Sequence, residues 1–493
     1  MPRPFRTVLV ANRGEIAMRV LRTVKAMGLR GAMVYHAADR DAPAVTAADL
    51  AIPISGSTPV GAYLDANEIL RAATQADADA IHPGYGFLAE NAAFVRRVAD
   101  AGLVFIGPAP EAIDLMGDKV RARGFVERRG FPVAPSAIED DDPASFAARA
   151  AKVGFPLLIK PSAGGGGKGM RIVREAGALD DQITRARSEG QRYFGDGRLY
   201  VERYVERPRH IEVQVLGDAH GNVVHLWERE CSVQRRFQKI VEETPSPALE
   251  PAKRNEICAT AAAIARAAAY RNAGTVEFIY SEDGTFYFLE MNTRLQVEHP
   301  VTEAVTGIDL VAEQIRVAMG ERLRFCQDDV RQRGHAIELR IYAEEPARNY
   351  APATGRILRL GLPEGPGIRV DSGVREGQQV TAAFDPMLAK LITHGDSRGE
   401  AIARARFALE HFVLLGCAIN AAFLDRLLAH PAFARGEIHT GFLDAHPELA
   451  ANPPIDSDTM LALLAAAALS QPQVLDAARA VPEPHASIGA WRN

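Results

Sequence analysis

Short apolar runs alternate with amphipathic segments in the N-terminal part of the chain. The run TVLVAN at 7–12 has the length of a buried strand, and GEIAMRVLRTVKAMG at 14–28 has apolar residues at helical spacing and ends on a glycine. Further apolar runs follow in GAMVYH at 31–36, ADAIHPGYGFLAEN at 78–91 and LVFIGP at 103–108. Strands that alternate with helices predict a doubly wound α/β domain, which we expect over residues 1–117.

A different pattern, strict alternation, occupies FYFLEMNTRLQVEHP at 286–300. With a period of two, its polar residues fall on one side of an extended segment: Glu290, Asn292, Arg294, Gln296 and Glu298. Alternation alone predicts no more than a half-buried strand with one wet face. The preceding stretch adds to this, because TVEFIY at 275–280 and the turn SEDG at 281–284 predict a hairpin that ends in this strand.

The hairpin brings a second carboxylate, Glu277, to the polar side. A loop over 282–285 puts Glu277 directly opposite Glu290, whereas a loop over 281–284 puts it opposite Phe288, diagonal to Glu290. In both registers the two carboxylates share one face. A hard divalent cation would offset their repulsion, and Asn292 adds a neutral oxygen two residues on. We therefore expect Glu277, Glu290 and Asn292 to bind Mg²⁺.

Arg294 and Glu298 follow this metal trio. A guanidinium fork suits a small planar oxyanion, and a neighbouring carboxylate suits a general base. A fully extended run from Glu290 to Glu298 would span about 26 Å, which is too long for one reaction centre. We therefore predict that the chain curls after Asn292 and brings Arg294, Gln296 and Glu298 around one small pocket.

The stretch GFPLLIKPSAGGGGKGMRIV at 154–173 places a glycine run between two apolar arms. A flexible linker is the simplest explanation of four glycines, but linkers seldom lie between apolar strands with a lysine at each end. Glycines let backbone N–H groups approach phosphate oxygens, and Lys160 and Lys168 supply positive charge. A Walker A loop is absent. We expect a mobile hairpin lid that closes over phosphates, within a small lobe at 118–204.

Two polar groups lie between the lid and the hairpin. HIEVQVL at 210–216 places His210, Glu212 and Gln214 on one face of a strand, and QRRFQK at 234–239 is a basic cluster. A surface histidine and a solvated basic face are the simpler interpretations. Because the basic cluster lies two predicted strands before the metal hairpin, we expect it to contact phosphate or bicarbonate.

Composition bounds the class of protein. A chain of 493 residues suits about three domains, and its net charge of −5 argues against a general nucleic-acid binder. The four scattered cysteines, Cys231, Cys258, Cys326 and Cys417, form no CxxC or disulfide pattern, which favours a reducing cytoplasm. We expect no membrane span, because no apolar run approaches about 20 residues.

Several longer motifs carry a resemblance to a known family. They are VANRGEIA at 10–17, HPGYGFLAEN at 82–91, MGDKV at 116–120, GGGGKGMR at 164–171, RHIEVQVLGD at 209–218, CSVQRRFQKIVEE at 231–243 and FLEMNTRLQVEHPVTE at 288–303. In this order the chain resembles biotin carboxylase of the ATP-grasp superfamily from about residue 7 to 445. The resemblance implies an α/β (α+β) fold that begins with the doubly wound domain. The glycine-rich lid at 118–204 and a catalytic core at 205–330 would follow. A C-terminal mixed-sheet domain at 331–445 would come next, ahead of an Ala/Pro-rich tail at 446–493.

The resemblance also implies roles for single residues. ATP would contact Lys119, Lys160, Gly166, Gly167, His210 and the hinge of Glu202, Arg203, Tyr204 and Val205. Bicarbonate would contact Lys239, Arg294, Gln296 and Val297, and Glu298 would deprotonate it. Mg²⁺ or Mn²⁺ would bind at the trio already identified, and Arg340 would stabilise the biotin enolate. Phe237 departs from the pattern, because the family often has histidine there as a nucleotide contact, so we expect weakened or altered ATP binding.

The implied activity is that of a ligase. Bicarbonate would attack the γ-phosphate of MgATP, and the resulting carboxyphosphate would carboxylate N1 of biotin as the first half-reaction of an acyl-CoA carboxylase. The motifs GPGIRVDSGV at 365–374, FDPMLAKLI at 384–392 and HPAFARGEIHTGFL at 430–443 make the segment 331–445 resemble the α-chains of methylcrotonyl- and geranyl-CoA carboxylases. No Lys-Met dipeptide is present to accept biotin, so the biotin is expected on a separate carrier protein, or on a domain missing from a truncated α-chain.

Partners and alternatives follow from the same resemblance. We expect a biotin carboxyl carrier, a carboxyltransferase subunit, and a homodimer or larger complex in the cytoplasm, with no nucleic acid or membrane. Two other functions stay open: a different bicarbonate-activating ATP-grasp ligase, and a non-catalytic or regulatory nucleotide-binding subunit of a carboxylase complex.

Overall fold

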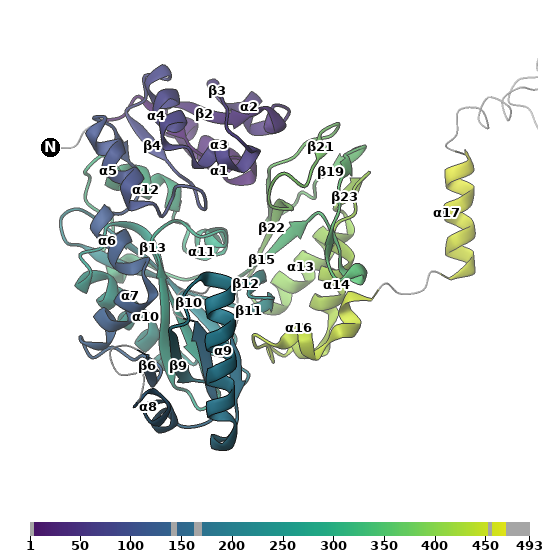
Figure 1. Cartoon of the computed structure of the whole chain (residues 1–493). Coiled ribbons are helices and arrows are strands. Elements are labelled where there is room, and N and C mark those ends of the chain that lie inside the picture. The colour runs from purple at the N-terminus through teal and green to yellow at the C-terminus, as the bar shows by residue number, and fades with distance from the viewer. Residues whose placement is uncertain (1–3, 140–144, 162–169, 452–455, 470–493) are drawn as a thin grey trace, which may run out of the picture. The chain divides into compact units, whose positions relative to one another are not determined.

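The computed structural model describes residues 4–139, 145–161, 170–451 and 456–469. The chain divides into a large unit, Met1–Leu449, and a small unit, Ala450–Asn493. The small unit contributes helix α17 (Ser457–Leu469), on which Leu461 and Leu464 are exposed. All the sheets that the structure describes belong to the large unit (Figure 1).

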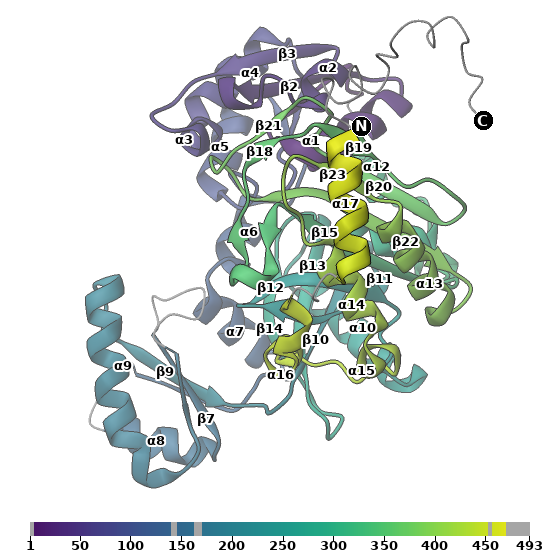
Figure 2. The ribbon, with the colours of Figure 1, turned by 90° about the vertical axis from the view of Figure 1, so that its right-hand side faces the viewer.

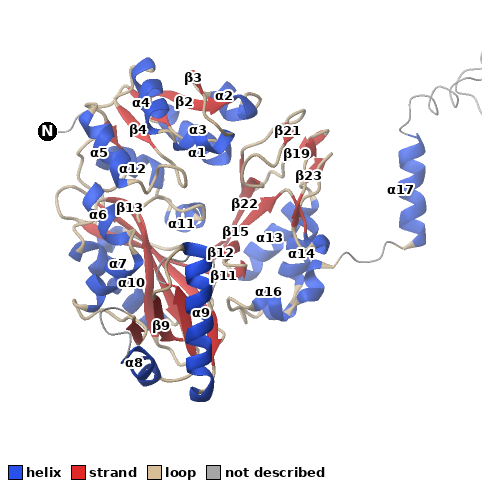
Figure 3. Cartoon of the chain, viewed as in Figure 1, coloured by secondary structure: helices blue, strands red, loops and turns tan. Residues whose placement is uncertain are grey.

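The large unit begins with a five-stranded parallel sheet of order β3-β2-β1-β4-β5. Its strands are β1 (Thr7–Val10), β2 (Arg30–His36), β3 (Leu50–Ile54), β4 (Ala80–His82) and β5 (Val104–Phe105). In β1, Val8 packs in one apolar cluster with Val20 of α1 (Gly14–Ala26), and Leu9 packs in another with Ile69 of α4 (Ala66–Gln75). Helices therefore cover both faces of the sheet (Figure 3), and the predicted doubly wound domain is confirmed.

A four-stranded antiparallel sheet follows, of order β6-β9-β7-β8. Its strands are β6 (Ser136–Ile138), β7 (Leu157–Pro161), β8 (Arg171–Val173) and β9 (Leu199–Arg203). Helices α8 (Phe146–Val153) and α9 (Leu179–Phe194) cover it, with Phe146 and Ile183 packed on Ile159. Figure 2 shows this sheet and its helices as a lobe of their own at the lower left. The lobe has a separate apolar core, so its strands do not depend on the neighbouring sheet for burial.

The largest sheet has eight strands in the order β14-β13-β10-β11-β12-β15-β22-β20, and every pairing is antiparallel. The strands are β10 (Arg209–Gly217), β11 (Val223–Arg235), β12 (Gln238–Thr244), β13 (Asn272–Tyr280), β14 (Phe286–Asn292), β15 (His335–Tyr342), β20 (Ile368–Ser372) and β22 (Met387–Gly395). Because β12 pairs with β15, the expected boundary between 205–330 and 331–445 falls between two strands of one continuous sheet.

The hairpin of β13 and β14 differs from both predicted registers. Near the turn Tyr280 pairs with Phe286, so the loop is Ser281–Thr285, one residue longer than either expectation. That register alone would turn the two carboxylates to opposite faces. A bulge between Glu277 and Phe278 shifts the pairing by one residue and sets Glu277 directly opposite Glu290. The carboxylates thus share a face because of the bulge.

Helices complete the unit. C-terminal helices α13 (Arg398–Glu410) and α14 (Ala421–Ala429) pack on β15 and β22 around Leu391 and Phe423. The remaining α-helices are α2 (Pro43–Ala47), α3 (Pro59–Leu64), α5 (Ala92–Asp100), α6 (Pro110–Met116), α7 (Lys119–Glu127), α10 (Pro251–Ala267), α11 (His299–Thr306), α12 (Leu310–Ala318), α15 (Pro431–Ala434) and α16 (Phe442–Ala445). Short two-stranded sheets pair β16 (Glu344–Glu345) with β17 (Ala351–Pro352), β18 (Gly355–Arg356) with β21 (Gln379–Val380) and β19 (Arg359–Gly361) with β23 (Val413–Leu415).

Among the helices that the structure describes, none has both the length and the apolar character needed to cross a bilayer.

Candidate active site

A cavity of about 1300 Å³ opens where the N-terminal sheet, the four-stranded lobe and the large sheet meet. Nearly all the site residues predicted from the sequence line it: Lys119, Lys160, Glu202, Arg203, Tyr204, Val205, His210, Lys239, Glu277, Glu290, Asn292, Arg294, Gln296, Val297 and Arg340. Glu298 is fully buried just below the lining, where it contacts Lys239 and Arg340. Gly166 and Gly167 lie outside the described residues.

The two opposed carboxylates are held by cations from neighbouring elements. Glu277 is buried; its Oε1 accepts from Lys239 Nζ at 2.8 Å and from Asn292 Nδ2 at 2.9 Å, and its Oε2 lies 2.7 Å from His210 Nε2. Glu290 Oε2 lies 2.9 Å from the Nζ of Lys119, at the start of α7. Burial would raise the pKa of Glu277, but the charges of Lys239 and His210 outweigh it and lower that pKa, so Glu277 is ionised.

The trio fits a hard divalent cation by its donor chemistry. Glu277 and Glu290 each offer carboxylate oxygens on one face of the hairpin, and Asn292 offers an amide oxygen two residues farther along β14. Mg²⁺ and Mn²⁺ prefer such oxygen donors. Both carboxylates also face the cavity, where phosphate oxygens of a nucleotide would complete the coordination.

The curl predicted after Asn292 is confirmed. Strand β14 ends at Asn292, and the chain then turns so that Arg294 Nη2 donates to Asn292 Oδ1 at 3.1 Å and Arg294 Nη1 donates to Gln296 Oε1 at 3.0 Å. Gln296 Nε2 in turn donates to Glu277 Oε1 at 3.2 Å. Arg294 is fixed from its far side by Glu90, whose Oε2 accepts from Nε at 2.8 Å. These contacts aim a pre-oriented guanidinium fork into the cavity.

The ammonium group of Lys239 contacts three buried carboxylates. Its Nζ donates to Glu298 Oε1 at 2.7 Å and to Glu277 Oε1 at 2.8 Å, and it also contacts Glu212. Burial would lower the pKa of Lys239, but the three carboxylates outweigh this and raise it well above its ordinary value. The ammonium is therefore a permanent positive charge at the floor of the cavity.

Glu298 lies between two cations. Besides Lys239, it accepts from Arg340 Nη2 at 2.9 Å through Oε2. Arg340 reaches it from β15, where its Nε also donates to Glu242 Oε1 at 2.7 Å. Burial would raise the pKa of Glu298, but the charges of Lys239, Arg340 and Arg229 lower it well below its ordinary value. Glu298 is thus ionised and able to accept a proton.

Lys160 and the predicted hinge residues lie on the lobe side of the cavity, whereas Lys119 and His210, also predicted to contact the nucleotide, lie at the metal hairpin. Lys160 of β7 pairs with Glu202 of β9, and Tyr200 Oη donates to Glu202 Oε2 at 2.8 Å. Arg203, Tyr204 and Val205 follow Glu202 along the wall that joins the lobe to the large sheet. This places the proposed hinge residues at the junction of two sheets.

The basic cluster QRRFQK forms the turn between β11 and β12. Arg236 and Phe237 both have left-handed backbone, with φ of 49° and 66°. Arg235 Nη1 donates to Glu344 Oε2 at 2.7 Å and Arg236 Nη2 donates to Asn349 Oδ1 at 2.9 Å. Phe237 lines the cavity with 66% of its surface exposed. Of the basic residues in the cluster, Lys239 is the one that contacts Glu212, Glu277 and Glu298.

Glu242, described above, was not predicted as a site residue, and neither were Arg229, Lys390 and Glu90. Arg229 is fully buried in β11 and donates to Gln214 Oε1 at 2.9 Å and to Glu212. Lys390 of β22 is also fully buried, and its Nζ donates to the carbonyl oxygen of Val297 at 2.7 Å. Glu90 supports Arg294. In WERE at 227–230 the charged residues follow one another without polar–apolar alternation, so no strand pattern indicated Arg229. Lys390 is distant in sequence from Val297, so no local pattern indicated their contact.

Comparisons with known proteins agree with this geometry. Residues 4–113 match the family model "Biotin carboxylase, N-terminal domain", 118–326 match "Carbamoyl-phosphate synthase L chain, ATP binding domain", and 338–445 match "Biotin carboxylase C-terminal domain". The chain is 49% identical to a biotin carboxylase of Halalkalibacterium halodurans, over 90% of this chain and 98% of that protein. The chain belongs to the biotin carboxylase family. The predicted resemblance is thereby confirmed.

Other biotin carboxylases and carboxylase subunits are similar. The α subunit of methylcrotonoyl-CoA carboxylase of Dictyostelium discoideum is 43% identical over 99% of this chain and 71% of that protein. The biotin carboxylase domain of a Hydrogenobacter thermophilus 2-oxoglutarate carboxylase, solved as a dimer with MgADP, ADP and bicarbonate, has a TM-score of 0.85 and 44% identity, covering 91% of this chain and 99% of that one. A biotin carboxylase of Campylobacter jejuni also has a TM-score of 0.85, at 41% identity over 90% and 99% of the two chains. The predicted ATP-grasp fold is confirmed.

Proposed function

We propose that this biotin carboxylase family member couples ATP cleavage to carboxylation of biotin, as the first half-reaction of a biotin-dependent acyl-CoA carboxylase. In the first step a bicarbonate oxygen attacks the γ-phosphorus of ATP, the bond to the β–γ bridging oxygen breaks, and carboxyphosphate and ADP form. In the second step carboxyphosphate breaks down to CO₂ and inorganic phosphate, the phosphate takes the proton of biotin N1, and N1 attacks the CO₂. The observation that carries this proposal is the contact chain Glu277–Lys239–Glu298–Arg340, which joins the metal hairpin to a buried base.

The phosphate end of the cavity would bind the nucleotide. Lys119 and Lys160 are within reach of the metal hairpin and the hinge, and both now pair with carboxylates, Glu290 and Glu202. A triphosphate would take over these ammonium groups. A divalent cation on Glu277, Glu290 and Asn292 would neutralise phosphate charge. We place the nucleotide base beside Glu202–Val205 and assign Gly166 and Gly167 to the phosphates on the family pattern alone.

The bicarbonate end follows the curl after Asn292. Arg294 would hold the planar anion with its fork, with Gln296, Lys239 and the backbone of Val297 completing the pocket. Glu298 would take the proton of bicarbonate. Its pKa is depressed by Lys239 and Arg340, so an anion that draws those charges toward itself raises the basicity of Glu298. Substrate binding therefore strengthens the base at the moment it is needed.

Arg340 would stabilise the second anion. When N1 of biotin loses its proton, negative charge moves to the ureido oxygen, and a fixed guanidinium facing the cavity lowers the energy of that enolate. Arg340 is buried, and its pKa is raised well above the ordinary value: burial lowers it, but Glu242, Tyr342 and Glu298 outweigh this. The charge is therefore present at every relevant pH.

The partners remain those of a multi-subunit carboxylase. We propose a biotin carboxyl carrier, a carboxyltransferase and a homodimer, supported by similar proteins that are carboxylase subunits and by a similar domain solved as a dimer. The proposed location in the cytoplasm is supported by the four cysteines, all of which are free. The chain spans 62% of a mouse methylcrotonoyl-CoA carboxylase α subunit and 98% of the bacterial biotin carboxylase above, so either arrangement of the carrier is compatible with its relatives.

The deciding experiment measures ADP release by the full chain with MgATP and free biotin, with and without bicarbonate. We expect turnover that requires bicarbonate and rises with biotin. Bicarbonate-dependent turnover that ignores biotin would instead indicate a different ATP-grasp ligase. Tight MgATP binding without any turnover would indicate a non-catalytic nucleotide-binding subunit.

A further inference from the structure

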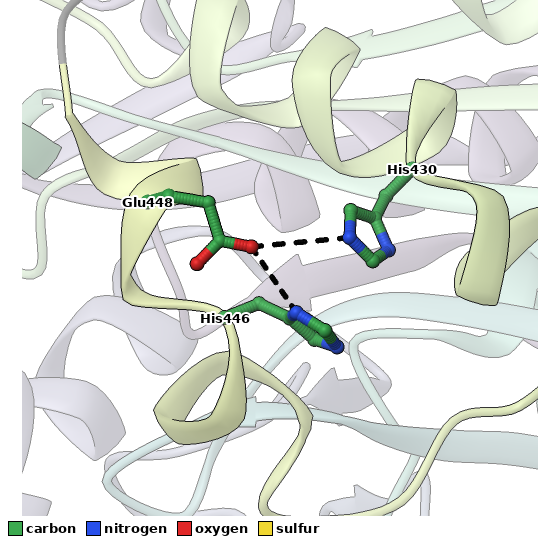
Figure 4. A group of neighbouring side chains, drawn as sticks. All are labelled: His430, His446 and Glu448. Carbon is green, nitrogen blue, oxygen red and sulfur yellow. Dashed lines mark hydrogen bonds and ion pairs between the residues drawn. The ribbon is translucent and has the colours of Figure 1, made fainter.

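Two histidines and a glutamate converge near the end of the large unit, outside the cavity lining (Figure 4). His430 lies between α14 and α15, His446 follows α16, and Glu448 is in the short 3-10 helix Pro447–Ala450. Glu448 Oε1 lies 3.1 Å from His446 Nδ1 and 3.9 Å from His430 Nε2. One donor atom from each of the three side chains lies within 4.8 Å of the others.

The spacing of these atoms suits a tetrahedral ion. Bonds of about 2.0–2.2 Å from zinc to nitrogen and oxygen put neighbouring ligand atoms about 3.4 Å apart. The two distances from Glu448 Oε1, 3.1 and 3.9 Å, lie on either side of this value. Two imidazole nitrogens and one carboxylate oxygen are donors that zinc-class ions accept, whereas Mg²⁺ and Ca²⁺ prefer oxygen alone.

The two rings are held in place by packing. Their centroids are 4.2 Å apart, and Phe442, which is buried, contacts both, with centroid distances of 5.8 Å to His430 and 4.8 Å to His446. The imidazole side chains are 21% and 28% exposed and that of Glu448 is 61% exposed. An ion can therefore enter from solvent and find two of its three ligands already positioned, which lowers the entropic cost of binding.

The charges around the group do not oppose a cation. Arg207 and Arg435 border the same groove, but Arg435 Nε lies 2.8 Å from Glu437 Oε1 and Arg207 Nε lies 3.5 Å from Glu282 Oε1. In the ion pairs that the structure describes, Glu448 is paired with the two imidazoles and with no lysine or arginine. A divalent ion would supply the positive charge that otherwise depends on protonating a histidine.

We propose that His430, His446 and Glu448 bind a divalent transition-metal ion of the zinc class, with water in the fourth position. The group is separate from the oxygen-donor trio of the active site. Its effect would be structural, because the loop it closes includes His439–Gly441 and Asp444, which line the main cavity. The ion would tie the end of α16 to the α14–α15 junction and stiffen that wall.

The test counts metal on the full chain after treatment with a chelator. Zinc per chain and the visible absorption of Co²⁺ are compared between wild type, His430→Ala, His446→Ala and Glu448→Gln, with His411→Ala as a matched control at an exposed histidine. Zinc can also bind at His210, Glu212 and Glu277, which are unchanged in all the variants. The deciding quantity is therefore the difference in bound zinc per chain between each variant and wild type.

We expect one ion fewer in each histidine variant and no change in His411→Ala. Loss of a residue that only supports a metal ligand weakens metal binding by about 10- to 100-fold. Loss of a ligand itself should weaken zinc binding by at least as much. Glu448→Gln changes a side chain that is 61% exposed, and a denaturant unfolding curve that matches wild type separates weaker metal binding from misfolding. Equal zinc stoichiometry and affinity in wild type and all variants would overturn the proposal. The contacts of Glu448 with the two histidines, a hydrogen bond to His446 and a longer polar contact with His430, would then only hold the end of the large unit together.

Discussion

Glu298 Oε2 and Arg340 Nη2 form an ion pair of 2.9 Å at the floor of the cavity, between the residue that precedes α11 and strand β15. The pair links the residue we assign to bicarbonate with the residue we assign to biotin. Because each carries part of the other's counter-charge, removing one changes the electrostatics of the other. The first two predictions separate their roles.

Glu298→Gln should reduce bicarbonate-dependent ATP turnover by about 10²- to 10⁴-fold, the usual contribution of a general base, while nucleotide affinity changes little. ADP release and a nucleotide titration measure the two effects. Glu282→Gln, at an exposed glutamate of the hairpin turn, is the control. Turnover within a few-fold of wild type would refute the role of Glu298 as the base.

Arg340→Ala should stop biotin carboxylation but leave slow biotin-independent ATP cleavage, because the enolate is formed only in the second step. Arg340→Lys keeps the charge without the fork and should recover part of the carboxylation. Both reactions are followed as ADP release and as carboxylated biotin. If the two activities fall by the same factor in both variants, Arg340 has no special role toward the enolate.

Phe237→His should tighten nucleotide binding by about 2- to 10-fold, which corresponds to one added hydrogen bond. Histidine also adopts the left-handed backbone found at this position, φ 66°, more readily than phenylalanine. KM for ATP and direct binding of ATP report the change. Phe237→Leu removes the ring without adding a donor and should not tighten binding. A gain in the leucine variant alone would mean that the ring obstructs the site.

Arg229→Met should destabilise the protein by about 3–5 kcal/mol, because it leaves Glu212 buried with one cation fewer. Denaturant unfolding measures the loss. The double variant Arg229→Met with Glu212→Gln should regain part of the stability, since the uncompensated charge is removed. Additive losses in the double variant would show that the two residues are not coupled.

Unfolding should become easier as the pH falls from about 6.5 to 4, in part through His82. Burial lowers the pKa of His82 to about 4, outweighing the hydrogen bond to Gln314, so the folded protein keeps this ring neutral. A base with a lowered folded pKa contributes stability that is fully present above its unfolded pKa, near 6.5, and is lost as the pH falls toward 4. The loss for this one group is about 3 kcal/mol.

His82→Gln tests this assignment. The variant should show a shallower fall in the free energy of unfolding over the same pH range, while His411→Gln, at an exposed position, should match wild type. A pH dependence identical in His82→Gln and wild type would assign the acid sensitivity to other groups, of which His225, with a pKa also lowered by burial to about 4, is the next to test.

Local periodicity predicted the parts of the fold that depend on local burial. The apolar runs of the N-terminal sheet and the curl after Asn292 followed from spacing and length. The shared face of Glu277 and Glu290 was predicted from strand parity, yet it depends on a one-residue bulge that no sequence pattern indicated. The prediction that the two carboxylates share a face was therefore correct, although the predicted loop and register of the hairpin were not.

The buried ion network could not be predicted in the same way. The contact of Arg340 with Glu242 requires the register of β12 against β15 and joins residues 98 positions apart. The contact of Lys390 with Val297 joins residues 93 positions apart and requires the packing of β22 on the turn after β14. Such pairs are fixed by tertiary structure alone. Motif resemblance supplied Arg340 and its partner Glu298, but not Glu242, which holds the other side of the guanidinium.

The pairing of β12 with β15 has a mechanical consequence. Lys239 and Arg340 stand on adjacent strands, so the charges assigned to the two substrate anions cannot separate unless ladder hydrogen bonds break. A chain cut at residue 330 would leave β12 as a bare edge with exposed amides, prone to aggregate and without Arg340. The distance between the two half-sites is thus built into the backbone.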